Sequence, residues 1–104
     1  MLVLNVSNEV TGFKVMASGT QTSDPADAKI IFRSALMLGT TKILLAHNYP
    51  SGNLQPSKAD IGFTKKVIVA GEAIDIPIVD HLIVSHNGYI SMRNERLCEF
   101  KDYV

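Results

Sequence analysis

The pattern of hydrophobic and polar positions predicts two strands and then a helix at the start of the chain. Residues 2–6 and 9–17 are rich in β-branched and aliphatic side chains, and the polar pair between them is typical of a hairpin turn. A polar loop then leads to Asp24 and Pro25, which suit the cap and the first position of a helix. Apolar residues at helical spacing continue as far as Gly39, a natural helix end.

The rest of the chain continues this alternation of strands and helices. Residues 42–46 form a short, continuous apolar run, which is typical of a buried central strand. We expect a second helix at residues 57–73 and two further strands at residues 78–84 and 88–92. The order ββαβαββ predicts an α/β (α+β) fold in which helices flank a mixed sheet. From about residue 94 we expect a charged tail.

The composition is typical of a soluble globular protein. The 104 residues are 46% apolar and 19% charged, so we expect a single domain over residues 1–104. The ten basic and ten acidic residues balance, which excludes the global positive field of a nonspecific DNA-binding protein. The single cysteine, Cys98, cannot form an intrachain disulfide. No secretory signal and no apolar run near the roughly 20 residues of a membrane span are visible, so we expect a cytoplasmic protein without membrane contact.

The residues suited to chemistry lie between the central strand and the second helix. His47 follows the strand, and Ser57 and Asp60 begin the helix. Zinc binds imidazole and carboxylate groups, and a catalytic zinc usually has three protein ligands and one water. Ser57 and Asp60 also fit a helix cap, because serine caps a helix and an acid three residues later complements its dipole. The nearby histidine favours the interpretation as a metal site.

The ordered motif resembles that of the RadC family, a bacterial branch of the JAMM/MPN (JAB) metalloprotease fold. The family motif is His-x-His, Pro-Ser-Gly and Pro-Ser-x-x-Asp, followed by a later Asp-His pair. The chain matches it at these positions: His47, Pro50, Ser51, Gly52, Pro56, Ser57, Asp60, Asp80 and His81. The resemblance covers residues 2–97 and implies a JAMM/MPN architecture, which is cytidine-deaminase-like. It also implies that His47 and Asp60 bind zinc and that Ser57 is the catalytic residue that hydrogen-bonds the reacting water or oxyanion.

Two positions depart from the family motif. Tyr49 stands in place of the second metal-binding histidine, and a phenol is a poor zinc ligand because its pKa is about 10. Val15 stands in place of the glutamate that activates the zinc-bound water, and Glu9 lies six residues too early. We therefore expect a degenerate site that binds zinc weakly or not at all. We expect Tyr49 to fill the emptied pocket, and His81 is a candidate substitute ligand.

Two interpretations stay open for the pair Asp80 and His81. In the first, both residues are neighbours of the metal site. In the second they form a structural pair, in which the carboxylate holds the imidazole in one tautomer.

The leading hypothesis is a catalytically degenerate RadC-like domain that binds an unknown protein or nucleoprotein partner. The first alternative is an active metal-dependent peptidase or isopeptidase, whose third ligand comes from His81, Tyr49 or another chain. The second alternative is a DNA-repair accessory, which needs a basic surface formed by residues such as Lys14, Lys42, Lys58 and Arg93. Full-length family members carry a helix-hairpin-helix segment that this sequence lacks, so we do not expect this domain alone to bind DNA. The β-rich ends allow a homodimer without indicating one.

Overall fold

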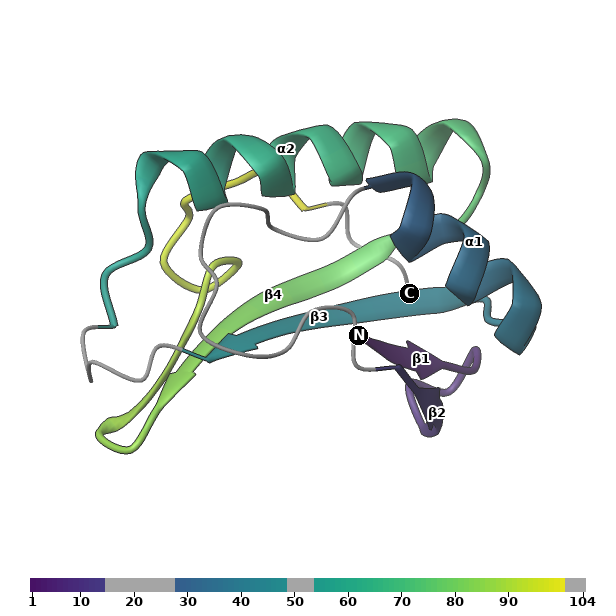
Figure 1. Ribbon diagram of the computed structural model, residues 1–104, viewed down its shortest axis with the longest axis horizontal. Helices are drawn as coiled ribbons and strands as arrows, with labels where there is room; N and C mark the ends of the chain where they lie inside the picture. The colour runs from purple at the N-terminus through teal and green to yellow at the C-terminus, as the bar shows by residue number, and fades with distance from the viewer. Residues whose placement is uncertain (15–27, 49–53, 101–104) are drawn as a thin grey trace.

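The computed structural model describes residues 1–14, 28–48 and 54–100. Its elements are β1 (Leu2–Leu4), β2 (Val10–Phe13), α1 (Ala28–Leu38), β3 (Lys42–Asn48), α2 (Lys58–Ala73), β4 (Ile78–Ser85) and β5 (Gly88–Ser91). The five strands form one mixed sheet in the order β2-β1-β3-β4-β5, in which β3 and β4 pair in parallel (Figure 1). The expected fold class is confirmed. No helix in the described ranges is long and apolar enough to cross a membrane.

Both helices lie on one face of the sheet (Figure 1). β2 and β3 run parallel because each is antiparallel to β1, so α1 joins two parallel strands, as α2 does between β3 and β4. Both connections advance across the sheet in the same direction, and right-handed crossovers therefore place both helices on the same side. The core between helices and sheet includes Ile31, Phe32, Ile43, Leu45, Val67, Ile68 and Ile83.

The register of β3 and β4 decides which side chains face the helices. Leu45 pairs with His81, and His47 pairs with Ile83. Because Leu45 and Ile83 belong to the core, all four side chains point toward the helices. Their neighbours along the two strands point to the opposite side, which we call the open face: Leu44, Ala46, Asn48, Asp80, Leu82 and Val84.

The β1–β2 hairpin is shorter than the pattern predicts. Its turn takes residues 5–9 instead of a polar pair. The side-chain oxygen Oδ1 of Asn5 accepts hydrogen bonds from the backbone nitrogens of Ser7, at 2.9 Å, and Glu9, at 3.0 Å. This side chain competes with the strand ladder for these backbone groups, so the strands end earlier. Residues 15–17 of the expected strand lie outside the described residues.

The segment after β5 packs against α2 where we expected a charged tail. The Cys98 side chain is buried, and its thiol donates to the carbonyl oxygen of Ile61 at 3.7 Å. Leu97 packs against the same core. Residues 94–100 therefore belong to the folded domain, while residues 101–104 lie outside the described ranges.

Candidate metal site

α2 begins with a capping box made by two of the predicted site residues. Ser57 is the N-cap, and its Oγ accepts a hydrogen bond from the backbone nitrogen of Asp60 at 3.0 Å. In return, Oδ2 of Asp60 accepts from the backbone nitrogen of Ser57 at 3.3 Å. These bonds pair backbone groups that the start of a helix leaves without partners. The capping interpretation is confirmed, and the cap holds the Asp60 carboxylate in place.

The other carboxylate oxygen of Asp60 faces the end of β3. Oδ1 of Asp60 lies 3.7 Å from Nδ1 of His47, which is an ion-pair distance and too long for a good hydrogen bond. The Asp60 side chain is 15% exposed and the His47 side chain 42% exposed, so the pair opens to solvent on the histidine side. The fold thus brings together the two metal ligands that the sequence motif predicts.

His81 lies next to this pair on the core side. Its ring is nearly parallel to the His47 ring, with the planes 20° apart and the ring centroids 6.2 Å apart. The side chain is buried. Burial is the main cause that lowers the pKa of His81 to about 4; His47 acts in the same direction, and Asp60 and Asp80 oppose it. The His81 imidazole is therefore neutral at pH 7.

Thr64 determines which ring nitrogen of His81 carries the proton. The Thr64 hydroxyl lies 2.7 Å from the carbonyl oxygen of Asp60 and 2.6 Å from Nδ1 of His81. Because a carbonyl oxygen can only accept, the hydroxyl proton goes to Asp60, and the hydroxyl oxygen accepts from the Nδ1–H of His81. The lone pair on Nε2 of His81 then has no hydrogen-bond donor among the described residues. Thr64 was missed at the sequence level, although its position one helical turn after Asp60 was a usable signal.

Asp80 does not join this group, although it precedes His81 in the sequence. Consecutive strand residues point to opposite sides of a sheet, so Asp80 lies on the open face. Its carboxylate accepts from the Ser91 hydroxyl, from the backbone nitrogen of Arg93 at 3.0 Å and from the backbone nitrogen of His81 at 2.7 Å. The interpretation in which Asp80 sets the tautomer of His81 is therefore wrong. Asp80 instead holds the turn after β5 against β4.

Three other residues considered for the site lie elsewhere or outside the described ranges. Tyr49 and Val15 are outside the described residues. The Glu9 carboxylate accepts from the side-chain nitrogen of Asn5 at 3.0 Å, in the turn between β1 and β2. That turn contacts the first residue of β3, whereas His47 lies near the other end of the strand. Glu9 therefore lies away from His47 and Asp60.

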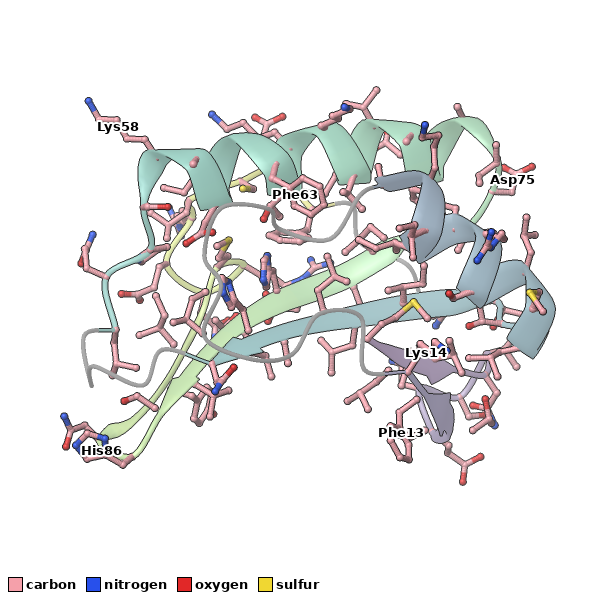
Figure 2. The ribbon with its side chains drawn as sticks, in the orientation of Figure 1. Phe13, Lys14, Lys58, Phe63, Asp75 and His86 are labelled. Carbon is pink, nitrogen blue, oxygen red and sulfur yellow. The ribbon has the colours of Figure 1, made fainter. Side chains whose placement is uncertain are left out.

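Two of the four basic residues considered for DNA binding lie far apart. Lys58 begins α2 and Lys14 follows β2, and Figure 2 shows them far apart on the molecule. The ammonium group of Lys42 donates to Asn8 at 2.8 Å, and the guanidinium group of Arg93 lies 5.3 Å from the ring centre of Phe100. Lys14 and Lys58 therefore do not belong to one positive patch for a phosphate backbone.

The candidate metal site offers fewer metal-binding side chains than a catalytic zinc usually requires. His47 and Asp60 supply two of the usual three protein ligands. Across residues 1–14, 28–48 and 54–100, no group of three or more His, Cys, Asp or Glu side chains is placed to hold a metal ion. The described residues therefore do not by themselves fit a catalytic zinc.

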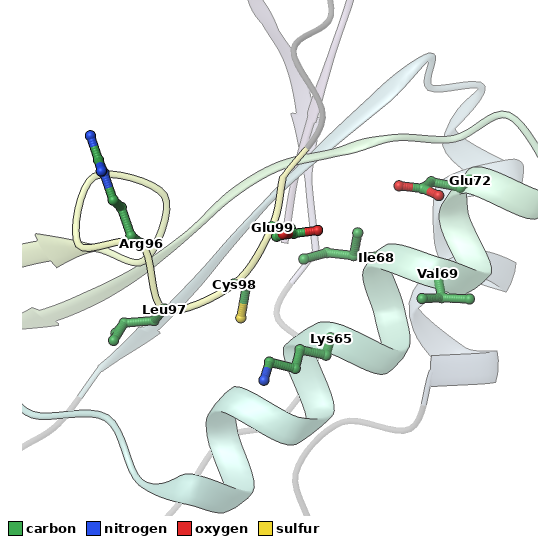
Figure 3. A pocket seen from close by; sticks show the side chains of 8 residues that line it. All are labelled: Lys65, Ile68, Val69, Glu72, Arg96, Leu97, Cys98 and Glu99. Carbon is green, nitrogen blue, oxygen red and sulfur yellow. The ribbon is translucent and has the colours of Figure 1, made fainter.

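A separate hollow of about 590 Å³ lies between α2 and the C-terminal segment, lined by Lys65, Ile68, Val69, Glu72, Arg96, Leu97, Cys98 and Glu99 (Figure 3). It contains none of the motif residues. Burial raises the pKa of the Cys98 thiol, while Lys65 acts against it. A thiol with a raised pKa is a poor nucleophile, and the burial of Cys98 agrees with a packing role.

A comparison with known families identifies the domain. Residues 1–97 match the family model of the RadC-like JAB domain. The chain belongs to the RadC-like JAB domain family. The resemblance that the motif indicated is thereby confirmed.

The curated relatives of this RadC-like JAB domain are longer bacterial proteins. A UPF0758 protein of Thermosynechococcus vestitus is 41% identical over 93 residues, which are 89% of this chain and 37% of that protein. A UPF0758 protein of Enterococcus faecalis is 42% identical over 94 residues, or 90% of this chain and 40% of that protein. A third UPF0758 protein, from Carboxydothermus hydrogenoformans, is 41% identical over 97 residues, which are 93% of this chain and 43% of that protein. The chain thus spans less than half the length of these relatives.

Proposed function

We propose that this RadC-like JAB domain is catalytically degenerate and acts by binding a protein or nucleoprotein partner. The observation that carries the proposal is the pair His47 and Asp60, the two donors that the described motif brings together. The sequence places Tyr49 where the family has its second histidine. A site with two strong ligands leaves its remaining positions to water, so it binds zinc weakly.

The replacement of the catalytic glutamate supports the same proposal. A positioned general base contributes about 10²–10⁴-fold to the rate of a hydrolysis. Val15 stands at the place of this base, and its side chain cannot accept a proton. Even a domain that held a metal ion would therefore lack the group that activates water.

Restoring the missing ligand tests the proposal. Wild type, Tyr49→His and His47→Ala are dialysed with excess zinc, freed of unbound ion and measured by elemental analysis. We expect Tyr49→His to retain about one zinc per chain, and wild type and His47→Ala to retain far less. Stoichiometric zinc in the wild type that is lost in His47→Ala would overturn the proposal, and hydrolysis of peptide or isopeptide substrates by that zinc-loaded wild type would overturn it as well.

An active metal-dependent hydrolase is the second candidate function, and the position of His81 favours it. The neutral His81 ring lies beside His47, and its Nε2 lone pair has no donor among the described residues. A small rotation of the rings would let His81 replace the ligand that Tyr49 does not supply. Under this candidate, His81→Asn lowers zinc retention as strongly as His47→Ala does. Equal zinc retention in wild type and His81→Asn excludes it.

A further inference from the structure

The Asp60 carboxylate uses only one of its two oxygens in a hydrogen bond within the described residues. Its Oδ2 accepts from the backbone nitrogen of Ser57, whereas Oδ1 has the longer contact with Nδ1 of His47 at 3.7 Å. The side chain is 15% exposed, so water reaches the charge over a small area. A charge that has lost most of its water is costly unless it has a charged partner or strong hydrogen-bond donors. Oδ1 is therefore a favourable position for a positively charged donor.

A second acceptor lies beside this carboxylate on the core side. The Nδ1–H of His81 donates to Thr64, which leaves the lone pair of Nε2 without a donor among the described residues. In the described ranges no side-chain nitrogen or oxygen is both buried and without a hydrogen-bond partner, so Nε2 reaches solvent although its residue is only 5% exposed. The His81 ring stacks on the His47 ring, which in turn contacts Asp60. One anionic and one neutral acceptor thus belong to the same site.

The described part of the chain does not supply a cation to this site. No lysine or arginine in these ranges forms an ion pair with Asp60. The amino group of Met1 acts on His81 through its charge, but it donates to the carbonyl oxygen of Lys14 at 3.0 Å. A cation that occupies the site would therefore come from another molecule.

The available acceptors suit an ammonium group better than zinc or a guanidinium group. Zinc needs about three ligands that converge at roughly 2.0–2.3 Å, and the described residues do not provide such a group. An ammonium group has three N–H donors, which reach separate acceptors at about 2.7–3.2 Å. A guanidinium group binds best with its fork on both oxygens of a carboxylate, but Oδ2 of Asp60 already belongs to the helix cap. The slender apolar stem of lysine can also enter a site in which His81 is buried.

We propose that the candidate metal site binds a lysine side chain of a partner protein, whose ammonium group donates to Oδ1 of Asp60 and to Nε2 of His81. This inference rests on the proposed function, and it names the chemistry of the partner: a protein that presents an exposed lysine. The Asp60 carboxylate repels phosphate groups, so the site selects against direct contact with a nucleic acid.

NMR titration of isotope-labelled protein with Nα-acetyl-lysine amide tests the proposal, at about pH 8 and with a chelator present. The lysine ammonium has an ordinary pKa of about 10.4, so it is charged at this pH. We expect saturable shifts at the end of β3 and the start of α2, with a dissociation constant in the millimolar range, and a shift of the Nε2 resonance of His81. Nα-acetyl-norleucine amide has a similar stem without the ammonium group and is expected to cause none of these shifts. Nα-acetyl-arginine amide is expected to bind more weakly than the lysine compound.

Asp60→Asn and Asp75→Asn form a matched pair, because each removes one negative charge. The amide oxygen in Asp60→Asn can still accept from Ser57, so the helix cap is kept. Asp75 is exposed at the opposite end of α2 (Figure 2), and its backbone φ of 60° suits asparagine. We expect the affinity to fall about tenfold or more in Asp60→Asn and to stay at the wild-type level in Asp75→Asn. His81→Asn removes the Nε2 acceptor, is also expected to weaken binding, and keeps the test valid if Asp60→Asn unfolds.

The absence of saturable shifts in the wild type up to about 50 mM lysine compound overturns the proposal. Wild-type affinity in folded Asp60→Asn and His81→Asn overturns it as well, as do equal shifts with the norleucine compound, equal loss in Asp75→Asn or tighter binding of the arginine compound. None of these failures touches the proposed function, because zinc retention is measured separately and without any amine. Stoichiometric zinc in the wild type would instead overturn the proposed function.

Discussion

Acidification is expected to destabilise this domain through His81. The pKa of His81 is about 4 in the folded protein, whereas an unfolded chain gives histidine a pKa of about 6.5. Between these two values the unfolded state binds a proton that the folded state does not, so stability falls as the pH decreases. The contribution is fully present above the unfolded pKa and is lost as the pH falls toward the folded pKa. Linkage gives a loss of about 2 kcal/mol between about pH 8 and about pH 5.

The assay is urea unfolding, followed by circular dichroism, at several values between about pH 8 and about pH 5. A chelator in all buffers removes any contribution from bound metal. His81→Asn is the matched variant, because its amide nitrogen can still donate to Thr64 but does not titrate. Carboxylates titrate in both proteins, so the difference between the two pH profiles isolates His81.

We expect the wild type to lose about 2 kcal/mol more than His81→Asn over this pH range. For a domain of this size the difference corresponds to a shift of roughly 10 °C in the melting temperature. Parallel pH profiles for the two proteins would refute the reasoning, because they would show that the folded state does not hold His81 in its neutral form.

Substitutions at four positions test other contacts by urea unfolding. Thr64→Val leaves a buried imidazole donor without its acceptor and is expected to cost about 1–3 kcal/mol. Ser57→Ala removes the cap of α2 and is expected to cost about 1 kcal/mol, whereas Ser57→Asn keeps the cap and should be nearly neutral. Gly71→Ala places a methyl group 2.3 Å from the carbonyl oxygen of Ile76 and is expected to cost about 2–3 kcal/mol. Gly62→Ala meets no atom within 4 Å and should stabilise α2 by about 0.5–1 kcal/mol; the opposite order of the two glycine variants would contradict this account.

The sequence by itself determined the order of the helices and strands. It also determined the two segments that form the candidate site, which are the end of β3 and the start of α2. The apolar run at residues 42–46 indicated β3, and Ser57 with Asp60 indicated the start of α2. These are local signals, because a buried run and a helix cap depend on residues close together in the chain. Since a strand and the helix that follows it meet at one edge of a parallel unit, the approach of His47 to Asp60 follows from the same pattern.

The partners of His81 and Asp80 were decided only by the tertiary structure. The pairing of β4 with β3 turns His81 toward α2, where Thr64 sets its tautomer, and turns Asp80 to the open face. The open face itself exists because two right-handed crossovers place both helices on the same side. Neither feature has a local signature, since strand register and helix placement depend on contacts between distant segments, and a shift of one residue would exchange the two faces of a strand.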